Sequence, residues 1–156
     1  ILPLSSFLKD CLLPKGFFPE KNIIPSFQQY IIDSAEFGIN LLNTISRFDV
    51  GQSAVVSSKL VYAIEGQEGT DCMIDRAGSL SNKNKLIAHP GPVLIKIPKI
   101  NQNINLDPPV VGFETVRKCI ENNFSSLVVS SNGTIIFEFK KIMNLINTKN
   151  FVIYVV

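Results

Sequence analysis

The sequence has few of the residues that zinc sites and nucleophilic triads require. Its single histidine, His89, stands alone before a proline, and no serine or cysteine lies in a recognisable nucleophile motif. Its three cysteines, Cys11, Cys72 and Cys119, are odd in number, far apart and without Cys-x-x-Cys spacing. We therefore expect buried or inert thiols in a reducing compartment, and neither a zinc site nor a catalytic triad.

An excess of one charge is missing as well. Lysine and arginine number 15 against 13 aspartate and glutamate residues, and the basic residues are scattered instead of forming a run beside aromatic ones. We expect no nucleic-acid partner. Walker and dinucleotide-binding fingerprints are also lacking, because the spacing of Gly66 and Gly69 fits neither.

No stretch of about 18 uninterrupted apolar residues is present, which argues against a membrane-spanning helix. Lys9 and Asp10 interrupt the apolar residues 2–13, and no Ala-x-Ala-like cleavage site follows, so a signal sequence is not expected either. The chain starts at Ile1 without an initiator methionine, and prolines and a glycine break residues 1–19, which we interpret as irregular structure behind a truncated amino end. We expect a soluble cytoplasmic protein.

Apolar residues make up 46% of the 156 positions, enough for one compact core and too few for two ordinary domains. From Pro25 to about Arg47 they recur every three or four residues, which predicts a long amphipathic helix. The β-rich runs 53–56 and 60–64 follow with hairpin spacing.

Further patterns complete a mixed α/β fold. Asn132-Gly133 is a strong turn signal and predicts a second hairpin between strands 126–129 and 134–137. The other predicted elements are helices at 71–78, 113–122 and 139–146 and buried strands at 93–97 and 151–156. The order is α-β-β-α-β-α-β-β-α-β, and we expect a single-domain α/β fold in which helices cover a mixed β-sheet.

A first candidate site contains three carboxylates within seven residues. Glu65, Glu68 and Asp71 are interleaved with glycines that let the backbone approach a ligand closely. Thr70 or Asp71 then opens a helix, whose free N–H groups attract phosphate oxygens. Such a segment suits Mg²⁺, which is commonly shared between one or two carboxylates and substrate phosphates. On residue types alone, the more frequent alternative is an N-cap residue and two solvated loop charges.

A second candidate site follows the strand at 93–97. Lys96 is unusual inside an apolar strand, so we expect it to face a surface or cleft where a counter-charge such as a phosphate waits. Lys99 and the amides after it, including Gln102, would add donors, and Asp107 before two prolines would add a carboxylate. The commoner alternative is a pair of surface lysines and an Asx-type turn.

Three strings occur in a specific order along the chain. They are Asp49-Val50-Gly51-Gln52-Ser53-Ala54-Val55-Val56, Glu68-Gly69-Thr70-Asp71 and Arg76-Ala77-Gly78, continued by residues 93–99, 107–112 and 114–116. Each string alone is weak, but in this order they resemble the signature of the LpxI family. The resemblance covers about residues 24–156.

The resemblance implies a bacterial Mg²⁺-dependent hydrolase. Such an enzyme cleaves the pyrophosphate of UDP-2,3-diacylglucosamine into 2,3-diacylglucosamine 1-phosphate (lipid X) and UMP during lipid A biosynthesis. It also implies two domains with the substrate cleft between them. Residues 1–22 would then be a remnant of the amino-terminal domain and linker, and residues 23–156 the carboxy-terminal catalytic domain. A homodimer and loose contact with the inner membrane are further implications.

Carried over position by position, the resemblance assigns catalysis to Asp71 and Asp107 and metal binding to Glu65, Glu68 and Asp71. The substrate-binding residues that it implies are Gln52, Gly69, Thr70, Lys96, Lys99 and Gln102. One departure concerns the loop after Lys99. Where the family usually has Gly-Gln-Asp, this chain has Asn101-Gln102-Asn103, so an expected acid is an amide that cannot act as a base.

Two alternatives to this enzyme stay open at the level of sequence. One is a non-catalytic domain that binds a nucleotide sugar or holds an oligomer together, and the other is a metal-dependent phosphohydrolase with another substrate. Neutralising Asp71 or Asp107 distinguishes the first, because only an enzyme loses turnover. A requirement for acyl chains distinguishes the second.

Overall fold

The computed structural model describes residues 11–20, 23–83, 90–103, 107–131 and 133–156. The elements in chain order are β1 (Gly16–Phe18), α1 (Pro25–Ile45), the 3₁₀ helix η3 (Ser46–Phe48), β2 (Ser53–Ser57), β3 (Leu60–Ile64), α2 (Gly69–Lys83), β4 (Val93–Lys96), β5 (Val110–Val111), α3 (Phe113–Glu121), β6 (Ser126–Val129), β7 (Ile135–Ile136), α4 (Phe139–Asn147) and β8 (Val152–Val155). The predicted α/β fold is confirmed.

Six of the strands form one mixed sheet in the order β1-β8-β6-β4-β2-β3. The three central strands β8, β6 and β4 run parallel, and α3 and α4 provide connections between them. On one side β2 pairs antiparallel with both β4 and β3, and on the other β1 pairs antiparallel with β8. The predicted mixed sheet and the hairpin over residues 53–64 are therefore confirmed.

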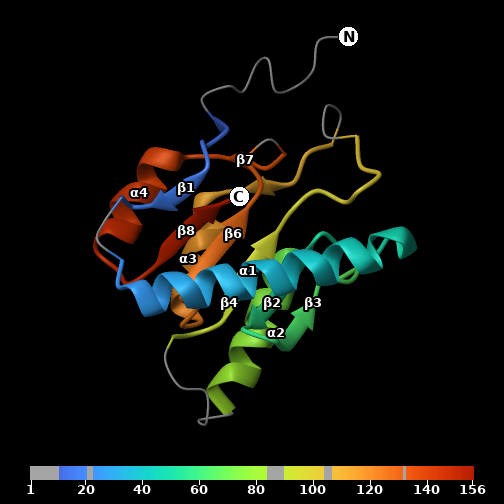
Figure 1. Ribbon diagram of the computed structural model, residues 1–156, viewed down its shortest axis with the longest axis horizontal. Coiled ribbons are helices and arrows are strands. Elements are labelled where there is room, and N and C mark those ends of the chain that lie inside the picture. The colour runs from blue at the N-terminus through green and yellow to red at the C-terminus, as the bar shows by residue number, and fades with distance from the viewer. Residues whose placement is uncertain (1–10, 21–22, 84–89, 104–106, 132) are drawn as a thin grey trace.

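Helices bury both faces of this sheet. Figure 1 shows α1, blue to cyan, crossing the near face of the sheet. Successive side chains of β4 alternate between the two layers: Val93 and Ile95 pack in the cluster that includes α1 residues, and Leu94 packs with residues of α2, α3 and α4. Because both faces are covered, the central strands are continuous apolar runs instead of alternating ones.

Helix α1 approaches the sheet closely at Gly38. It begins at Pro25, whose fixed φ suits the first helical turn, and its buried residues recur at the three- and four-residue spacing that predicted it. At Gly38 a side chain would collide with β4, since an added Cβ would lie 2.4 Å from Ile95 Cγ1. Glycine at this position thus sets the distance between the helix and the sheet.

The second predicted hairpin is wrong. β6 does not pair with β7: its two edges carry β4 and β8, both parallel to it, so no edge is left for a hairpin partner. β7 pairs instead with β5 in a separate two-stranded parallel sheet. Asn132 of the turn signal lies outside the described residues, and Gly133 N–H donates to Ser130 O at 3.5 Å in a local turn.

Residues 1–19 are not irregular throughout, as we had expected. β1 at 16–18 is an edge strand of the main sheet, and Phe17 stacks on Tyr154 of β8 with ring centroids 4.3 Å apart. Helix α2 is also longer than the predicted 71–78. The domain boundary between residues 22 and 23 stays a prediction, and His89 lies outside the described residues.

The three cysteines are free thiols in different environments. Cys119 is buried, which raises the pKa of its thiol and keeps it protonated. Cys72 is exposed, so of the two alternatives, a buried or an inert thiol, only the inert one remains for it, and that stays a prediction. Within the described part of the chain, no helix combines the length and the apolar character needed to cross a bilayer.

The close approach at Gly38 generates a stability prediction. Gly38→Ala should lower the free energy of unfolding by about 1–3 kcal/mol, because the new methyl group overpacks the layer between α1 and β4. This loss should outweigh the gain in helix propensity of roughly 1 kcal/mol. Urea denaturation measures it, with the exposed Glu36→Ala on the same helix as control. A Gly38→Ala protein as stable as the wild type would contradict this packing.

Candidate functional site

Three loops meet at one edge of the sheet. The parallel strands β4 and β6 both end there, and the antiparallel strand β2 begins there, with Ser53 opposite Lys96. β3 returns to the same edge, where Glu65 N–H donates to Ser53 O at 2.9 Å. Residues 49–52, 65–67, 99–103 and 107, distant in sequence, are therefore neighbours. Ligands of α/β proteins usually bind at this carboxyl edge of parallel strands.

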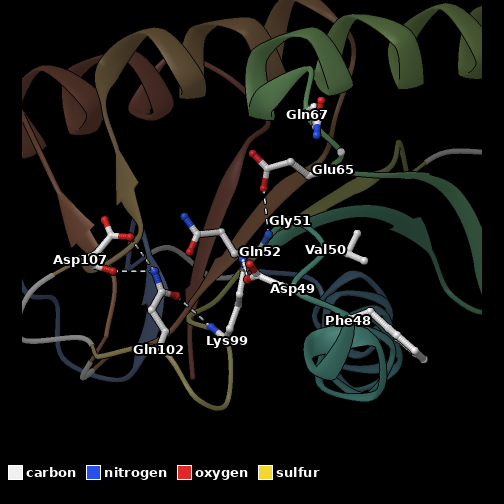
Figure 2. Close-up of a pocket in the computed structure, with 11 residues that line it drawn as sticks. Phe48, Asp49, Val50, Gly51, Gln52, Glu65, Gln67, Lys99, Gln102 and Asp107 are labelled. Atoms are coloured by element: carbon white, nitrogen blue, oxygen red, sulfur yellow. Dashed lines mark hydrogen bonds and ion pairs between the residues drawn. The ribbon is translucent and has the colours of Figure 1, made fainter.

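A cavity of about 480 Å³ lies between these loops. Figure 2 shows its walls, with Gln52 between Glu65 and Asp107. The lining combines three carboxylates, three side-chain amides and one lysine, and its residues are Phe48, Asp49, Val50, Gly51, Gln52, Glu65, Gly66, Gln67, Lys99, Gln102 and Asp107. Such a cavity offers both hydrogen-bond donors for an anion and hard oxygen atoms for a cation.

Beneath one wall lies a buried polar chain. Lys96 Nζ donates to Thr70 Oγ1 at 2.8 Å, and Thr70 Oγ1 donates to Glu65 Oε1 at 2.7 Å. Lys96 is 7% exposed and Glu65 is 9% exposed. Burial lowers the pKa of the Lys96 ammonium, while the carboxylates of Glu65 and Asp71 act in the opposite direction. The expectation that Lys96 faces a surface or cleft is therefore wrong, because Lys96 is buried outside the cavity and its counter-charges are carboxylates of the protein itself.

Glu65 also holds the loop at 51–52. Its Oε2 accepts the Gln52 N–H at 3.0 Å, and its carbonyl accepts the Gly51 N–H at 3.1 Å. Only glycine fits at residue 51, because an added Cβ would lie 2.5 Å from Glu65 Cβ. Among the described residues, Gln52 Oε1 is the buried side-chain polar atom that has no hydrogen-bond partner. A buried unpaired acceptor on a cavity wall is suited to a ligand donor.

The opposite wall is organised by Gln102, which Figure 2 shows between Lys99 and Asp107. Gln102 Oε1 accepts the Lys99 N–H at 3.0 Å, and its Nε2 donates to the Asp107 carbonyl at 2.5 Å. Lys99 Nζ lies 2.6 Å from Asp49 Oδ1 and lowers the pKa of that exposed carboxyl. The side chains of Asp49 and Asp107 are both accessible to a ligand.

The structure brings together half of the predicted site. Gln52, Glu65, Lys99, Gln102 and Asp107 line the cavity, and the sequence analysis had selected all five. The remaining predicted residues do not line it, namely Glu68, Gly69, Thr70, Asp71 and Lys96. The roles assigned to all of these residues stay predictions.

The positions of Glu68 and Asp71, which lie outside the cavity, can be described further. Glu68 forms an ion pair with Arg76 at 2.5 Å, which lowers the pKa of its carboxyl. Asp71 is exposed in the first turn of α2, which begins at Gly69 with a φ of 79°. Phe48, Asp49 and Gln67 also line the cavity and were not among the predicted site residues. Asp49 stands directly before Val50-Gly51-Gln52, and that position was the available signal.

The carboxylates offer a partial metal site. Among the described residues, no group of three or more histidine, cysteine, aspartate or glutamate side chains could hold a metal ion. The predicted set Glu65, Glu68 and Asp71 is therefore not assembled, because Glu68 pairs with Arg76 and Asp71 lies outside the cavity. Mg²⁺ needs only one or two carboxylates when phosphates and water complete its shell. The oxygen donors of the cavity fit that arrangement.

Comparison with known proteins gives two matches. The family model described as the LpxI C-terminal domain matches residues 24–154. The protein named UDP-2,3-diacylglucosamine pyrophosphatase LpxI from Caulobacter vibrioides (strain ATCC 19089 / CIP 103742 / CB 15) is 32% identical over 121 residues, which make up 76% of this chain and 41% of that protein. The chain thus spans about two fifths of the length of the relative that it matches.

The contact between Gly51 and Glu65 generates the second prediction. Gly51→Ala should cost about 1–3 kcal/mol of unfolding free energy, because its methyl group would collide with Glu65 Cβ and the Glu65 carbonyl. Gly112→Ala is the matched control: its φ is −113°, and an added Cβ meets nothing within 4 Å. Thermal or urea unfolding that shows equal effects for the two substitutions would contradict the described loop.

Proposed function

The chain belongs to the LpxI family, and we propose that it takes part in hydrolysing UDP-2,3-diacylglucosamine to 2,3-diacylglucosamine 1-phosphate (lipid X) and UMP, a step of lipid A synthesis. The relative's name supports this substrate. The observation that carries the proposal is the cavity at the carboxyl edge of the sheet, where Lys99 and three carboxylates face one space. An uncharged or purely acidic cavity would not suit a pyrophosphate.

The lining residues suit both phosphate binding and the activation of water. Lys99 and the amides of Gln67 and Gln102 are donors for phosphate oxygens, and Gly51 and Gly66 leave their backbone close to the cavity. Hydrolysis requires water to attack one phosphorus while the bridging P–O bond breaks, and a carboxylate to take the proton of that water. Asp107 is the exposed carboxylate best placed for this proton or for a metal ion.

Mg²⁺ fits this cavity as a shared ion. We propose Asp107 as its protein ligand, because both oxygens of Glu65 already accept hydrogen bonds and Asp49 pairs with Lys99. When bound, the ion would neutralise charge on the pyrophosphate. Lys99 would then orient the phosphates, and Gln102 would hold Lys99 and Asp107 at a constant separation.

The relative is much longer than the part of it that this chain matches, which bears on how the substrate is enclosed. This chain corresponds to two fifths of that protein, so we propose that the substrate is enclosed only when the rest of the polypeptide is present. The two acyl chains named in the substrate would then contact residues outside this chain. The homodimer and the contact with the inner membrane stay predictions.

Release of UMP from UDP-2,3-diacylglucosamine by the full-length protein tests the proposal. The wild type should be active with Mg²⁺ and inactive with EDTA, and Asp107→Asn should lose roughly 10²–10⁴-fold in kcat, because the carboxylate charge is removed. Asp33→Asn, on the exposed face of α1, is the matched control and should retain wild-type turnover.

Two results would contradict the proposal. A folded, metal-replete wild type that releases no UMP yet binds UDP would point to the nucleotide-sugar-binding module. Equal turnover of substrates with and without acyl chains would point to a phosphohydrolase of another specificity. Asp71→Ala in the same assay tests the catalytic role predicted for that exposed residue.

A further inference from the structure

The buried chain of Lys96, Thr70 and Glu65 has only one possible direction. A lysine ammonium has hydrogens to donate and no lone pair, so in their 2.8 Å hydrogen bond Thr70 Oγ1 must be the acceptor. The hydroxyl has one hydrogen, and Glu65 Oε1 at 2.7 Å is a closer acceptor for it than Ser53 Oγ at 3.5 Å. The three groups therefore form an ordered link between β4, the first turn of α2 and the end of β3.

This link reaches the cavity although Lys96 does not line it. Glu65 Oε2 accepts the Gln52 N–H, and the Gln52 carbonyl accepts the Ile97 N–H at 3.2 Å, one residue beyond Lys96. The Gln52 N–H is thus held by Glu65, which is linked to Lys96 through Thr70, and the Gln52 carbonyl is held by Ile97, the neighbour of Lys96 in sequence. Its side chain lies on the cavity wall with Oε1 unpaired.

We propose that Lys96 is a positioning residue that acts through Thr70 and Glu65 to present Gln52 Oε1 as an acceptor for a hydroxyl or N–H donor of the substrate. This inference rests on the proposed function and replaces our expectation that Lys96 binds a phosphate. Lys96 is 7% exposed and donates to Thr70, whereas Lys99 lines the cavity, where its ammonium pairs with the exposed Asp49 and has further hydrogens for an anion. The two lysines of the Lys-x-x-Lys string thus have different tasks.

Substitutions of Thr70 distinguish two possible roles of Lys96, positioning Gln52 and binding a phosphate directly. Thr70→Val keeps the shape of the side chain and removes the hydroxyl, and it leaves the Lys96 ammonium in place. If the link positions Gln52, Thr70→Val and Lys96→Met should each lower kcat/KM of the full-length protein by roughly tenfold to hundredfold. Together they should cost no more than either alone, since both break one link. Thr70→Ser should restore most of the activity.

Gln52→Ala then distinguishes positioning from a general loss of stability. In a protein that already lacks the Gln52 side chain, Thr70→Val should have little further effect on kcat/KM, while its effect on the unfolding midpoint should persist. Thr148→Val removes an exposed hydroxyl at the end of α4 and should change neither quantity. Additive losses of kcat/KM in Thr70→Val and Gln52→Ala would overturn the inference, as would a Lys96→Met loss far larger than that of Thr70→Val.

A second measurement keeps this test independent of the proposed function. Hydrogen exchange of the Gln52 amide in the full-length protein should speed up in Thr70→Val and stay slow in Thr70→Ser, because the Glu65 carboxylate accepts this amide and is itself held by the Thr70 hydroxyl. If the wild type releases no UMP but the exchange changes as expected, the proposed function fails and the link stands. Unchanged exchange in Thr70→Val would overturn the link itself.

Discussion

Two opposite charges buried at the edge of a sheet are the constraint on which this site depends. Lys96 and Glu65 are both largely removed from water, which costs more free energy than their attraction returns unless hydrogen bonds satisfy them. The Thr70 hydroxyl meets this requirement for both at once. Because each of the three residues belongs to a different segment, the end of β3, the start of α2 and the end of β4 are held together, and the cavity wall at 51–52 follows from Glu65.

Local sequence patterns predicted most of the fold and failed where a strand pairs with strands that are distant in sequence. The spacing of apolar residues over short stretches predicted the long helix from Pro25 and the hairpin over 53–64, and both are present. The Asn132-Gly133 turn signal was misleading, because β6 is a central strand whose edges both pair with distant strands. The strands β1 and β5, which were not predicted, contain only three and two residues, too few for any periodicity to appear.

The sequence predicted which loops form the site, but not which of their side chains line the cavity. Glu65, Glu68 and Asp71 are close in sequence, yet the helix that begins at Gly69 separates them: Glu65 precedes it and lines the cavity, and Asp71 lies within its first turn. Lys96 and Lys99 are likewise neighbours in sequence and differ in burial. The pairing of Ser53 with Lys96 brings residues 49–52 next to Lys99, Gln102 and Asp107, and this long-range pairing cannot be predicted from local sequence patterns.

A crystal structure of the full-length Asp107→Asn protein with UDP-2,3-diacylglucosamine would test the proposed roles of Lys99, Gln52 and Lys96 together, because one electron-density map shows the substrate contacts and the buried hydrogen bonds. We expect the pyrophosphate in the cavity beside Lys99, a substrate donor on Gln52 Oε1, and Lys96 still bonded to Thr70. A pyrophosphate bound elsewhere, or in direct contact with Lys96, would contradict these roles.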